Sequence, residues 1–317
     1  MAVKKVGIIG SGQVGTTIAT VWLQYGRSVV VRDVAEPILQ KARATIEGSL
    51  DRRVAKGDLT PAQKEETMKR LVTSTDVSAL KDVDLVVEAA SEDIALKKRI
   101  FAELDKVCSQ KTILCTNSSS IPITTIASAT KRPDRCVKMH FWYPATAIGY
   151  MELSRGYLTS DESWETVKEL ALELDRKPLR IVQDYQGLGN QYLQMEMPAK
   201  GGVWWELMMG KATLQEVEAR PKGKTPEGRE QVLNWMEMQD FIGLDTMLGI
   251  AMAAVEEYGS AQSYPCPLHR RMVEAGHLGQ KTGIGFYDYS KSPRKAIMGQ
   301  FSPYLVKFLT REKEYIA

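Results

Sequence analysis

The stretch Lys5-Val6-Gly7-Ile8-Ile9-Gly10-Ser11-Gly12-Gln13-Val14-Gly15 decides the fold. Its first five residues are nearly all apolar, which is typical of a strand buried in a parallel sheet. Three glycines follow in GxGxxG spacing, before a segment, 16–25, with apolar residues at helical spacing. In such a unit Gly10 permits a tight turn, Gly12 lets a pyrophosphate approach the backbone, and Gly15 lets the helix pack against the strand. The stretch predicts a dinucleotide-binding Rossmann domain.

Asp33 follows the next apolar segment, 28–31, at the distance where this motif places an acidic residue. A carboxylate there is placed to bind both hydroxyls of an adenosine ribose and to repel a 2′-phosphate. Arg32 beside it weakens that exclusion, because an arginine can pair with such a phosphate. We therefore predict NAD as the cofactor, in preference to NADP.

Further apolar segments continue the pattern of buried strands, at 71–74, 84–90, 112–116 and 179–182. The segment 112–116 runs into Asn117-Ser118-Ser119-Ser120. In a doubly wound fold these polar groups lie at the carboxyl edge of the sheet, where ligands bind. The fold class predicted is therefore α/β, and the serine-rich turn is a candidate ligand-binding segment. A plain polar turn is the alternative interpretation.

His140 stands near the end of another predicted strand, in Cys136-Val137-Lys138-Met139-His140-Phe141-Trp142-Tyr143-Pro144. Glu152 follows after a turn, in Tyr150-Met151-Glu152-Leu153. A carboxylate that binds a histidine fixes its tautomer and raises its basicity, which suits the pair to shuttle a proton at neutral pH. The alternative is a core histidine satisfied by a backbone carbonyl.

The composition restricts the class of protein. The 317 residues, with 44% hydrophobic and 26% charged side chains, indicate a two-domain globular chain. The net charge of +3 is too small to indicate a nucleic-acid or anionic membrane partner, and no apolar run approaches the roughly 20 residues of a membrane span. The N-terminus shows no signal peptide, and the four cysteines have no CxxC spacing. We expect a cytoplasmic protein with reduced thiols and no metal site.

Together these motifs resemble the L-3-hydroxyacyl-CoA dehydrogenase family, which includes 3-hydroxybutyryl-CoA dehydrogenases and, more distantly, lambda-crystallin/gulonate dehydrogenases. Two stretches of the second half match as well, Ile-Gly-Leu-Asp-Thr at 242–246 and Gly-Gln-Lys-Thr-Gly-Ile-Gly-Phe-Tyr at 279–287. The resemblance covers nearly the whole chain. It implies that His140 is the catalytic acid/base, that Glu152 is its partner, and that Ser119 lies near the substrate oxygen.

The resemblance also implies the arrangement around the active site. The residues expected along the nicotinamide–ribose side of the cofactor are Glu92, Lys97 and Asn117. We expect an NAD-binding Rossmann domain at 1–186, a helical domain for substrate binding and dimerisation at 187–290, and a C-terminal tail at 291–317. The reaction implied is hydride transfer between nicotinamide and the 3-hydroxy or 3-keto carbon of a small 3-hydroxyacyl substrate.

The chain departs from the family at predicted pocket positions. The family usually has His-Phe-Phe-Asn-Pro, whereas Tyr143 stands here at the asparagine position. Gln191 stands where the family has a substrate-contacting asparagine, although a shift of one residue would place Asn190 there. Trp235 falls where the family has a Pro-Phe segment. Most of these changes enlarge a side chain, so we expect a reshaped and more aromatic cleft.

These departures keep two alternatives open. The first is an altered-specificity dehydrogenase, or an imine reductase or amine dehydrogenase, that acts on a non-CoA ketone, a hydroxy acid or an imine. Natural drift and deliberate engineering would both rewrite a pocket in this way. The second is a non-catalytic cofactor-binding structural protein, against which the retention of both His140 and Glu152 argues.

Overall fold

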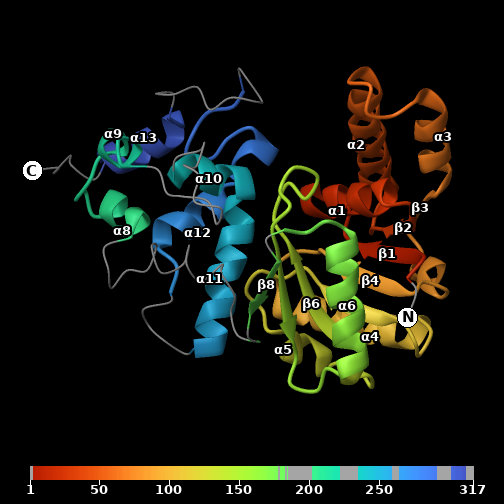
Figure 1. Cartoon of the computed structure of the whole chain (residues 1–317). Helices are drawn as coiled ribbons and strands as arrows, with labels where there is room; N and C mark the ends of the chain where they lie inside the picture. Colours follow the sequence, from red (N-terminus) through yellow and green to blue (C-terminus); the bar gives the residue numbers. More distant parts are fainter. Residues whose placement is uncertain are drawn as a thin grey trace, which may run out of the picture. The chain divides into compact units, whose positions relative to one another are not determined.

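The structure is a computed structural model, and it describes residues 3–177, 179–182, 184, 202–221, 235–258, 264–290 and 301–311. The chain divides into two compact units, Met1–Gly187 and Leu188–Ala317 (Figure 1). The predicted Asn190 and Gln191 lie outside the described residues, as does the side chain of Trp235.

The first unit is built on one sheet of eight strands in the order β3-β2-β1-β4-β5-β6-β7-β8. The strands are β1 (Lys5–Ile9), β2 (Ser28–Arg32), β3 (Leu71–Ser74), β4 (Leu85–Glu88), β5 (Ile113–Thr116), β6 (Cys136–Phe141), β7 (Met151–Arg155) and β8 (Leu179–Val182). Every neighbouring pair is parallel except β6 and β7. The chain builds outward from β1 to β3 and then returns to place β4 on the other side of β1, which creates the switch point where such folds bind ligands. The predicted Rossmann fold is confirmed.

Helices of the first unit connect the strands (Figure 1). They are α1 (Gln13–Gln24), α2 (Glu36–Ala55), α3 (Pro61–Lys69), α4 (Ile94–Val107), α5 (Ile123–Ala127) and α6 (Asp161–Glu173). Local sequence signals start several of them. Thr60 and Gln63 form a reciprocal capping box at the start of α3, and the side chain of Asp93 accepts a hydrogen bond from the Leu96 backbone N–H at the start of α4.

Strand β6 is buried along its whole length. Val137, Met139 and Phe141 belong to the main core cluster together with Trp164 of α6. Because side chains alternate along a strand, the even-numbered residues of β6 point to the opposite face of the sheet. That face carries His140.

The described part of the second unit is mainly helical, as predicted (Figure 1). Its helices are α8 (Val203–Met208), α9 (Leu214–Glu218), α10 (Trp235–Ile242), α11 (Leu244–Tyr258), α12 (Pro267–Glu274) and α13 (Pro303–Arg311). Trp204, Phe286 and Leu305 belong to its core cluster. Helix α13 falls in the segment predicted as a C-terminal tail, and Leu305 attaches it to that core.

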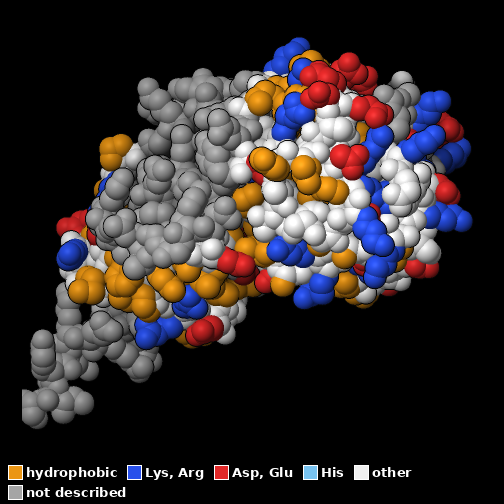
Figure 2. All heavy atoms as spheres, turned by 90° about the horizontal axis from the view of Figure 1, so that it is seen from below, with side chains coloured by type: hydrophobic (Ala, Val, Ile, Leu, Met, Phe, Trp, Pro, Cys, Tyr) orange, Lys and Arg blue, Asp and Glu red, His pale blue; other side chains and the backbone are white. Residues whose placement is uncertain are grey.

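The surface of the first unit carries charges of both signs (Figure 2), and the cysteines lie in the interior. Figure 2 shows acidic and basic side chains interspersed over the visible face of the first unit, which accords with the small net charge. All four cysteines are buried and unpaired. Within the described ranges, no helix is long and apolar enough to cross a membrane, and no group of His, Cys, Asp and Glu side chains is arranged to hold a metal ion.

Candidate active site

The antiparallel pairing of β6 with β7 brings His140 and Glu152 together. The strand register places the two residues directly opposite each other, where side chains on one face are in contact. The distance from His140 Nδ1 to Glu152 Oε2 is 2.9 Å, and Glu152 is only 1% exposed. Because the carboxylate accepts, Nδ1 carries the hydrogen of this bond and the tautomer of the ring is fixed.

Ser119 contacts the other ring nitrogen of the same histidine. The turn after β5 places Ser119 Oγ 3.0 Å from His140 Nε2. Strands β5 and β6 are parallel neighbours, so the end of one and the end of the other meet at the carboxyl edge of the sheet. The three predicted catalytic residues therefore form one continuous hydrogen-bonded chain, Ser119–His140–Glu152.

Two aromatic residues of this face were missed by the sequence reasoning. Tyr150 donates its hydroxyl to Glu152 Oε1 over 3.3 Å, and its ring meets Trp142 edge-on with centroids 4.9 Å apart. The ring of Trp142 lies 6.4 Å from that of His140. The available signal was the alternation itself, because Trp142 and Tyr150 stand two residues from His140 and Glu152 respectively. Tyr143 follows Trp142 and is partly buried, which raises the pKa of its hydroxyl.

Glu92 is held by the serine-rich turn. Its Oε1 accepts from Ser118 Oγ at 2.5 Å, from Ser120 Oγ at 2.7 Å and from the Ser120 backbone N–H at 3.0 Å. Burial alone would raise the pKa of Glu92, but the Lys97 ammonium and these hydrogen bonds outweigh burial and lower that pKa to about 2. Glu92 is therefore a carboxylate that orders the turn carrying Ser119.

Lys97 lies deeper, and the protein satisfies its ammonium. It is 1% exposed and contacts Glu88 at 2.7 Å, the Ala90 carbonyl at 3.1 Å and Glu92 at 3.4 Å. Burial lowers the pKa of Lys97, but the two carboxylates outweigh it and raise that pKa above its ordinary value. An ammonium has three donors, so the protein already uses all of them. Lys97 therefore contacts Glu92 from the interior and has no donor left for a ligand.

Asn117 joins the turn after β5 to the end of β6. Its side-chain oxygen accepts the Phe141 backbone N–H at 2.7 Å, next to His140. This bond fixes the relative position of the two strand ends that carry Ser119 and His140.

The glycine-rich turn has the geometry that a dinucleotide needs. Gly10 has a φ of +88°, and a Cβ on Gly15 would stand 1.9 Å from the Gly10 carbonyl oxygen, so neither position tolerates a side chain. A Cβ on Gly12 would meet nothing within 4 Å, so the backbone at the start of α1 is open to approach. Open N–H groups at a helix N-terminus suit a pyrophosphate. This part of the chain fits NAD.

Asp33 is bonded to the glycine-rich turn. Its Oδ2 accepts from the Ser11 backbone N–H at 2.6 Å and from Ser11 Oγ at 2.8 Å, while Oδ1 accepts from the Val34 backbone N–H at 2.7 Å. The carboxylate is therefore held beside the turn that carries Gly10 and Gly12.

Lys138 is the unexpected residue of this face. It is 1% exposed, and its Nζ has no hydrogen-bond partner among the described residues, in contrast to Lys97. Burial lowers the pKa of Lys138, against the raising effect of Asp184, Glu92 and Glu152. A buried ammonium without a partner is costly, and this cost is the cause of the lowered pKa.

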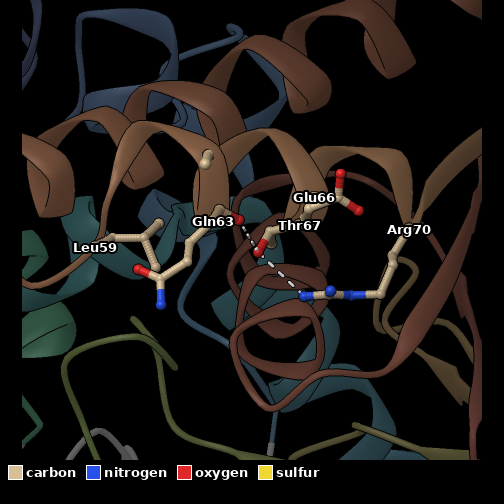
Figure 3. A pocket seen from close by; sticks show the side chains of 6 residues that line it. Leu59, Gln63, Glu66, Thr67 and Arg70 are labelled. Atoms are coloured by element: carbon tan, nitrogen blue, oxygen red, sulfur yellow. Dashed lines mark hydrogen bonds between the residues drawn. The ribbon is translucent and has the colours of Figure 1, made fainter.

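One cavity lies away from these residues. It has a volume of 360 Å³ and is lined by Leu59, Ala62, Gln63, Glu66, Thr67 and Arg70, at helix α3 (Figure 3). Arg70 is one of the lining residues, and its guanidinium donates to Thr67 Oγ1 (Figure 3) and to the Leu23 carbonyl. None of the predicted site residues lines it, so it is not the active site.

Comparisons with known proteins identify the family of the chain. Residues 5–185 match the family model of the 3-hydroxyacyl-CoA dehydrogenase NAD-binding domain, and residues 231–289 match that of the C-terminal domain of the same family. A 3-hydroxybutyryl-CoA dehydrogenase of Bradyrhizobium diazoefficiens is 37% identical, over 90% of this chain and 96% of that protein. One of Clostridioides difficile is 34% identical, over 90% of this chain and 100% of the relative. The crystal structure of (S)-3-hydroxybutyryl-CoA dehydrogenase from Ralstonia eutropha superimposes with a TM-score of 0.73 at 34% identity, over 92% of this chain and 100% of that one. The chain belongs to the 3-hydroxyacyl-CoA dehydrogenase family.

Proposed function

We propose that this NAD-dependent dehydrogenase interconverts a 3-hydroxyacyl compound and its 3-keto form, with a CoA thioester as the first substrate class to test. The observation that carries the proposal is the chain Ser119–His140–Glu152, with both ring nitrogens of the histidine engaged at 3.0 and 2.9 Å. The names of the relatives support the substrate class, because they are 3-hydroxybutyryl-CoA dehydrogenases.

In the direction of oxidation, His140 Nε2 takes the proton of the substrate hydroxyl. The imidazolium so formed is stabilised by Glu152, which already accepts from Nδ1. Ser119 Oγ hydrogen-bonds the reacting oxygen and stabilises the charge that develops on it. In reduction His140 returns the proton. Bound NAD supplies the nicotinamide that accepts or returns the hydride.

The cofactor is held by the residues of the glycine-rich turn and by Asp33. The backbone at Gly10, Gly12 and Gly15 takes the pyrophosphate, and Asp33 binds the adenosine ribose. Glu92 and Asn117 order the turn between this region and the histidine, and Lys97 acts through Glu92. Asp33 would also disfavour a 2′-phosphate by like charge, which supports NAD over NADP.

Replacement of His140 by glutamine tests the assignment. His140→Gln should lower turnover by roughly 10²–10⁴-fold, the usual contribution of a positioned proton-transfer group. NADH binding, measured by isothermal titration, should stay within about twofold, because none of the cofactor-holding residues named here is changed. Activity equal to that of the parent on acetoacetyl-CoA would refute the catalytic role of His140.

A second candidate is a dehydrogenase or imine reductase that acts on a non-CoA ketone, a hydroxy acid or an imine. It is favoured by the aromatic residues beside the histidine, Trp142 and Tyr150, and by Tyr143 in the turn that follows. Steady-state assays with NADH against acetoacetyl-CoA, a free 3-keto acid, and a ketone plus an amine distinguish the candidates. Tyr143→Asn should shift the kcat/KM ratio toward acetoacetyl-CoA. An unchanged ratio would move the search for the specificity determinant to Asn190, Gln191 and Trp235.

The assembly and location are also proposals. The second unit exposes large apolar residues, among them Met209, Met252 and Tyr304, and Figure 2 shows apolar side chains gathered on it. We propose a homodimer through this unit, which sedimentation velocity at micromolar concentration tests, with a monomer as the contradicting result. Trp204 and Leu207 belong to the core of this unit and are each only 2% exposed, so they are not part of the proposed surface. The unpaired cysteines support a cytoplasmic location.

A further inference from the structure

We propose that Trp142 limits the size of the alkyl group on the carbinol carbon of the substrate, and that Tyr150 sets this limit with it by holding the indole in place. The inference rests on the proposed function, because it takes His140 as the group beside the reacting oxygen. It narrows the proposed substrate class to compounds with a short alkyl group.

The sheet places the two aromatic residues opposite each other. The last paired residues of β6 and β7 are Phe141 and Met151. Beyond them Trp142 continues from β6 and Tyr150 precedes β7, so the two stand in the next register position on the face that carries His140. Their rings meet edge-on, with centroids 4.9 Å apart and an interplanar angle of 82°. Aromatic pairs prefer this arrangement.

Tyr150 is fixed from two sides. Its ring contacts Trp142, and its hydroxyl donates to Glu152 Oε1 at 3.3 Å. Glu152 is itself buried, and its other carboxylate oxygen is bonded to His140. The indole therefore packs against a side chain that cannot turn away without breaking its hydrogen bond to the carboxylate. At 3% exposure Tyr150 offers almost no surface of its own to a substrate, so it acts as a positioning residue.

Trp142 differs from Tyr150 in being partly exposed. Its ring lies 6.4 Å from the ring of His140, measured between centroids. A substrate whose hydroxyl is bonded to His140 Nε2 has its carbinol carbon next to the imidazole. The indole is then within reach of the groups on that carbon.

The two carbon groups on the carbinol carbon differ in where they end. The thioester arm of a CoA substrate continues into a large nucleotide, so it has to leave the site. The alkyl group ends inside the site. A wall that cannot move limits the size of a group that ends against it, and an apolar pocket discriminates between substrates by single methylenes in this way. The braced indole therefore limits the length of the alkyl group.

Steady-state reduction of two thioesters with NADH tests the inference on the full-length protein. The substrates are acetoacetyl-CoA and 3-oxohexanoyl-CoA, whose alkyl group is longer by two methylenes. The measured quantity is the ratio of kcat/KM for the longer substrate to kcat/KM for the shorter one. Because both substrates are assayed with the same protein sample, any loss of folded protein cancels from the ratio.

Trp142→Phe should raise the ratio by about 10-fold or more, because one methylene in an apolar pocket is worth about 10–200-fold in kcat/KM. Tyr150→Leu should also raise it, since leucine leaves the indole without its edge-on contact. Added to Trp142→Phe, Tyr150→Leu should have little further effect, because no indole is left to hold. Tyr157→Leu is the matched control. It changes an 89% exposed tyrosine of the same unit and should keep the parent ratio.

Tyr150→Phe separates the two contacts of Tyr150. Phenylalanine keeps the ring that meets the indole and removes only the hydroxyl that donates to Glu152. The ratio should therefore stay at the parent value, while kcat/KM changes by the same factor for both substrates.

An unchanged ratio in Trp142→Phe would overturn the inference. Additive effects of Trp142→Phe and Tyr150→Leu would overturn the role of Tyr150, because the two side chains would then act independently. A ratio that shifts in Tyr150→Phe as much as in Tyr150→Leu would overturn it as well. Failure of the proposed function has a different signature: the parent would reduce neither thioester, which would refute the substrate class and this inference together.

Discussion

Replacement of Lys138 by methionine should stabilise the protein, by an amount that increases as the pH falls. Lys138 is fully enclosed on the face of the sheet that carries His140, and its amine has no partner in the described part of the chain. The carboxylates close enough to act on the Lys138 amine already accept hydrogen bonds from other groups. Asp184 accepts two backbone N–H groups at the start of α5, Glu92 accepts from the serine turn, and Glu152 accepts from His140.

The expected gain in folding stability of Lys138→Met has two parts. An unpaired amine in the interior costs about 1–3 kcal/mol even when it is neutral, and methionine keeps the unbranched shape without that cost. The second part depends on proton linkage. Burial holds the pKa of Lys138 in the folded protein below its ordinary value of 10.5, so between the folded pKa and 10.5 the unfolded chain binds more protons than the folded chain. Folding stability is thus lost by about 1.4 kcal/mol for each pH unit below 10.5, until the folded pKa is reached.

Urea denaturation followed by circular dichroism measures the difference between parent and variant. The variant should be more stable than the parent below pH 10.5, and the difference should widen as the pH falls from 10.5 toward the folded pKa. Lys97→Met is the matched comparison, because it replaces an equally buried lysine that has partners. It should destabilise by about 3–5 kcal/mol, since Glu88 and Glu92 lose their counter-charge. A Lys138→Met variant that is less stable than the parent, or whose gain is the same at every pH, would refute the reasoning.

Three further predictions concern the active site and the second unit. Glu152→Gln should lower turnover roughly 10–100-fold at unchanged NADH affinity, because the His140 imidazolium loses a charged hydrogen bond. Single-turnover kinetics measure the change in rate, and full activity would contradict the pairing. Tyr150→Phe removes the hydroxyl that donates to Glu152 Oε1, so kcat/KM for oxidation at a fixed pH should differ from that of the parent, whereas Tyr157→Phe should leave it unchanged. Burial raises the pKa of Asp240 to about 7, so the folded protein keeps a proton on Asp240 that the unfolded chain releases above about pH 4. As the pH rises from about 4 to 7, the parent should therefore lose up to about 4 kcal/mol of unfolding free energy relative to Asp240→Asn. Urea denaturation measures this difference, and a difference that is the same at every pH would exclude the linkage.

The parts of the site that depend on local sequence could be predicted. The glycine-rich turn and Asp33 are read from a motif whose spacing follows from one strand–turn–helix unit. The proximity of His140 and Glu152 was also expected, because the carboxylate follows the strand that carries the histidine after a turn. The glycine-rich motif was enough to predict the fold class, and the histidine with its carboxylate was enough for the hypothesis of proton transfer.

The parts that depend on register and on burial from both faces could not be predicted. The alternation in β6 makes Lys138 look solvent-facing, but every residue of that strand is buried. The contact between Trp142 and Tyr150 requires knowing that β7 runs antiparallel to β6 within an otherwise parallel sheet. Nothing in a single sequence shows which strand of such a sheet is reversed. The docking of α13 on the second core likewise depends on a distant partner surface.

The reversed strand has a consequence for how this enzyme can change over generations. On one face, β6 and β7 present successive opposite pairs, first Lys138 with Ser154 and then His140 with Glu152. Trp142 and Tyr150 follow just beyond the last backbone-paired residues. Because Trp142 and Tyr150 lie outside the paired register, we expect mutations there to change the surroundings of His140 and Glu152 while the backbone bonds that set their spacing stay in place. If the proposed roles hold, new substrates would arise at the outer pair and the inner pair would keep its chemistry.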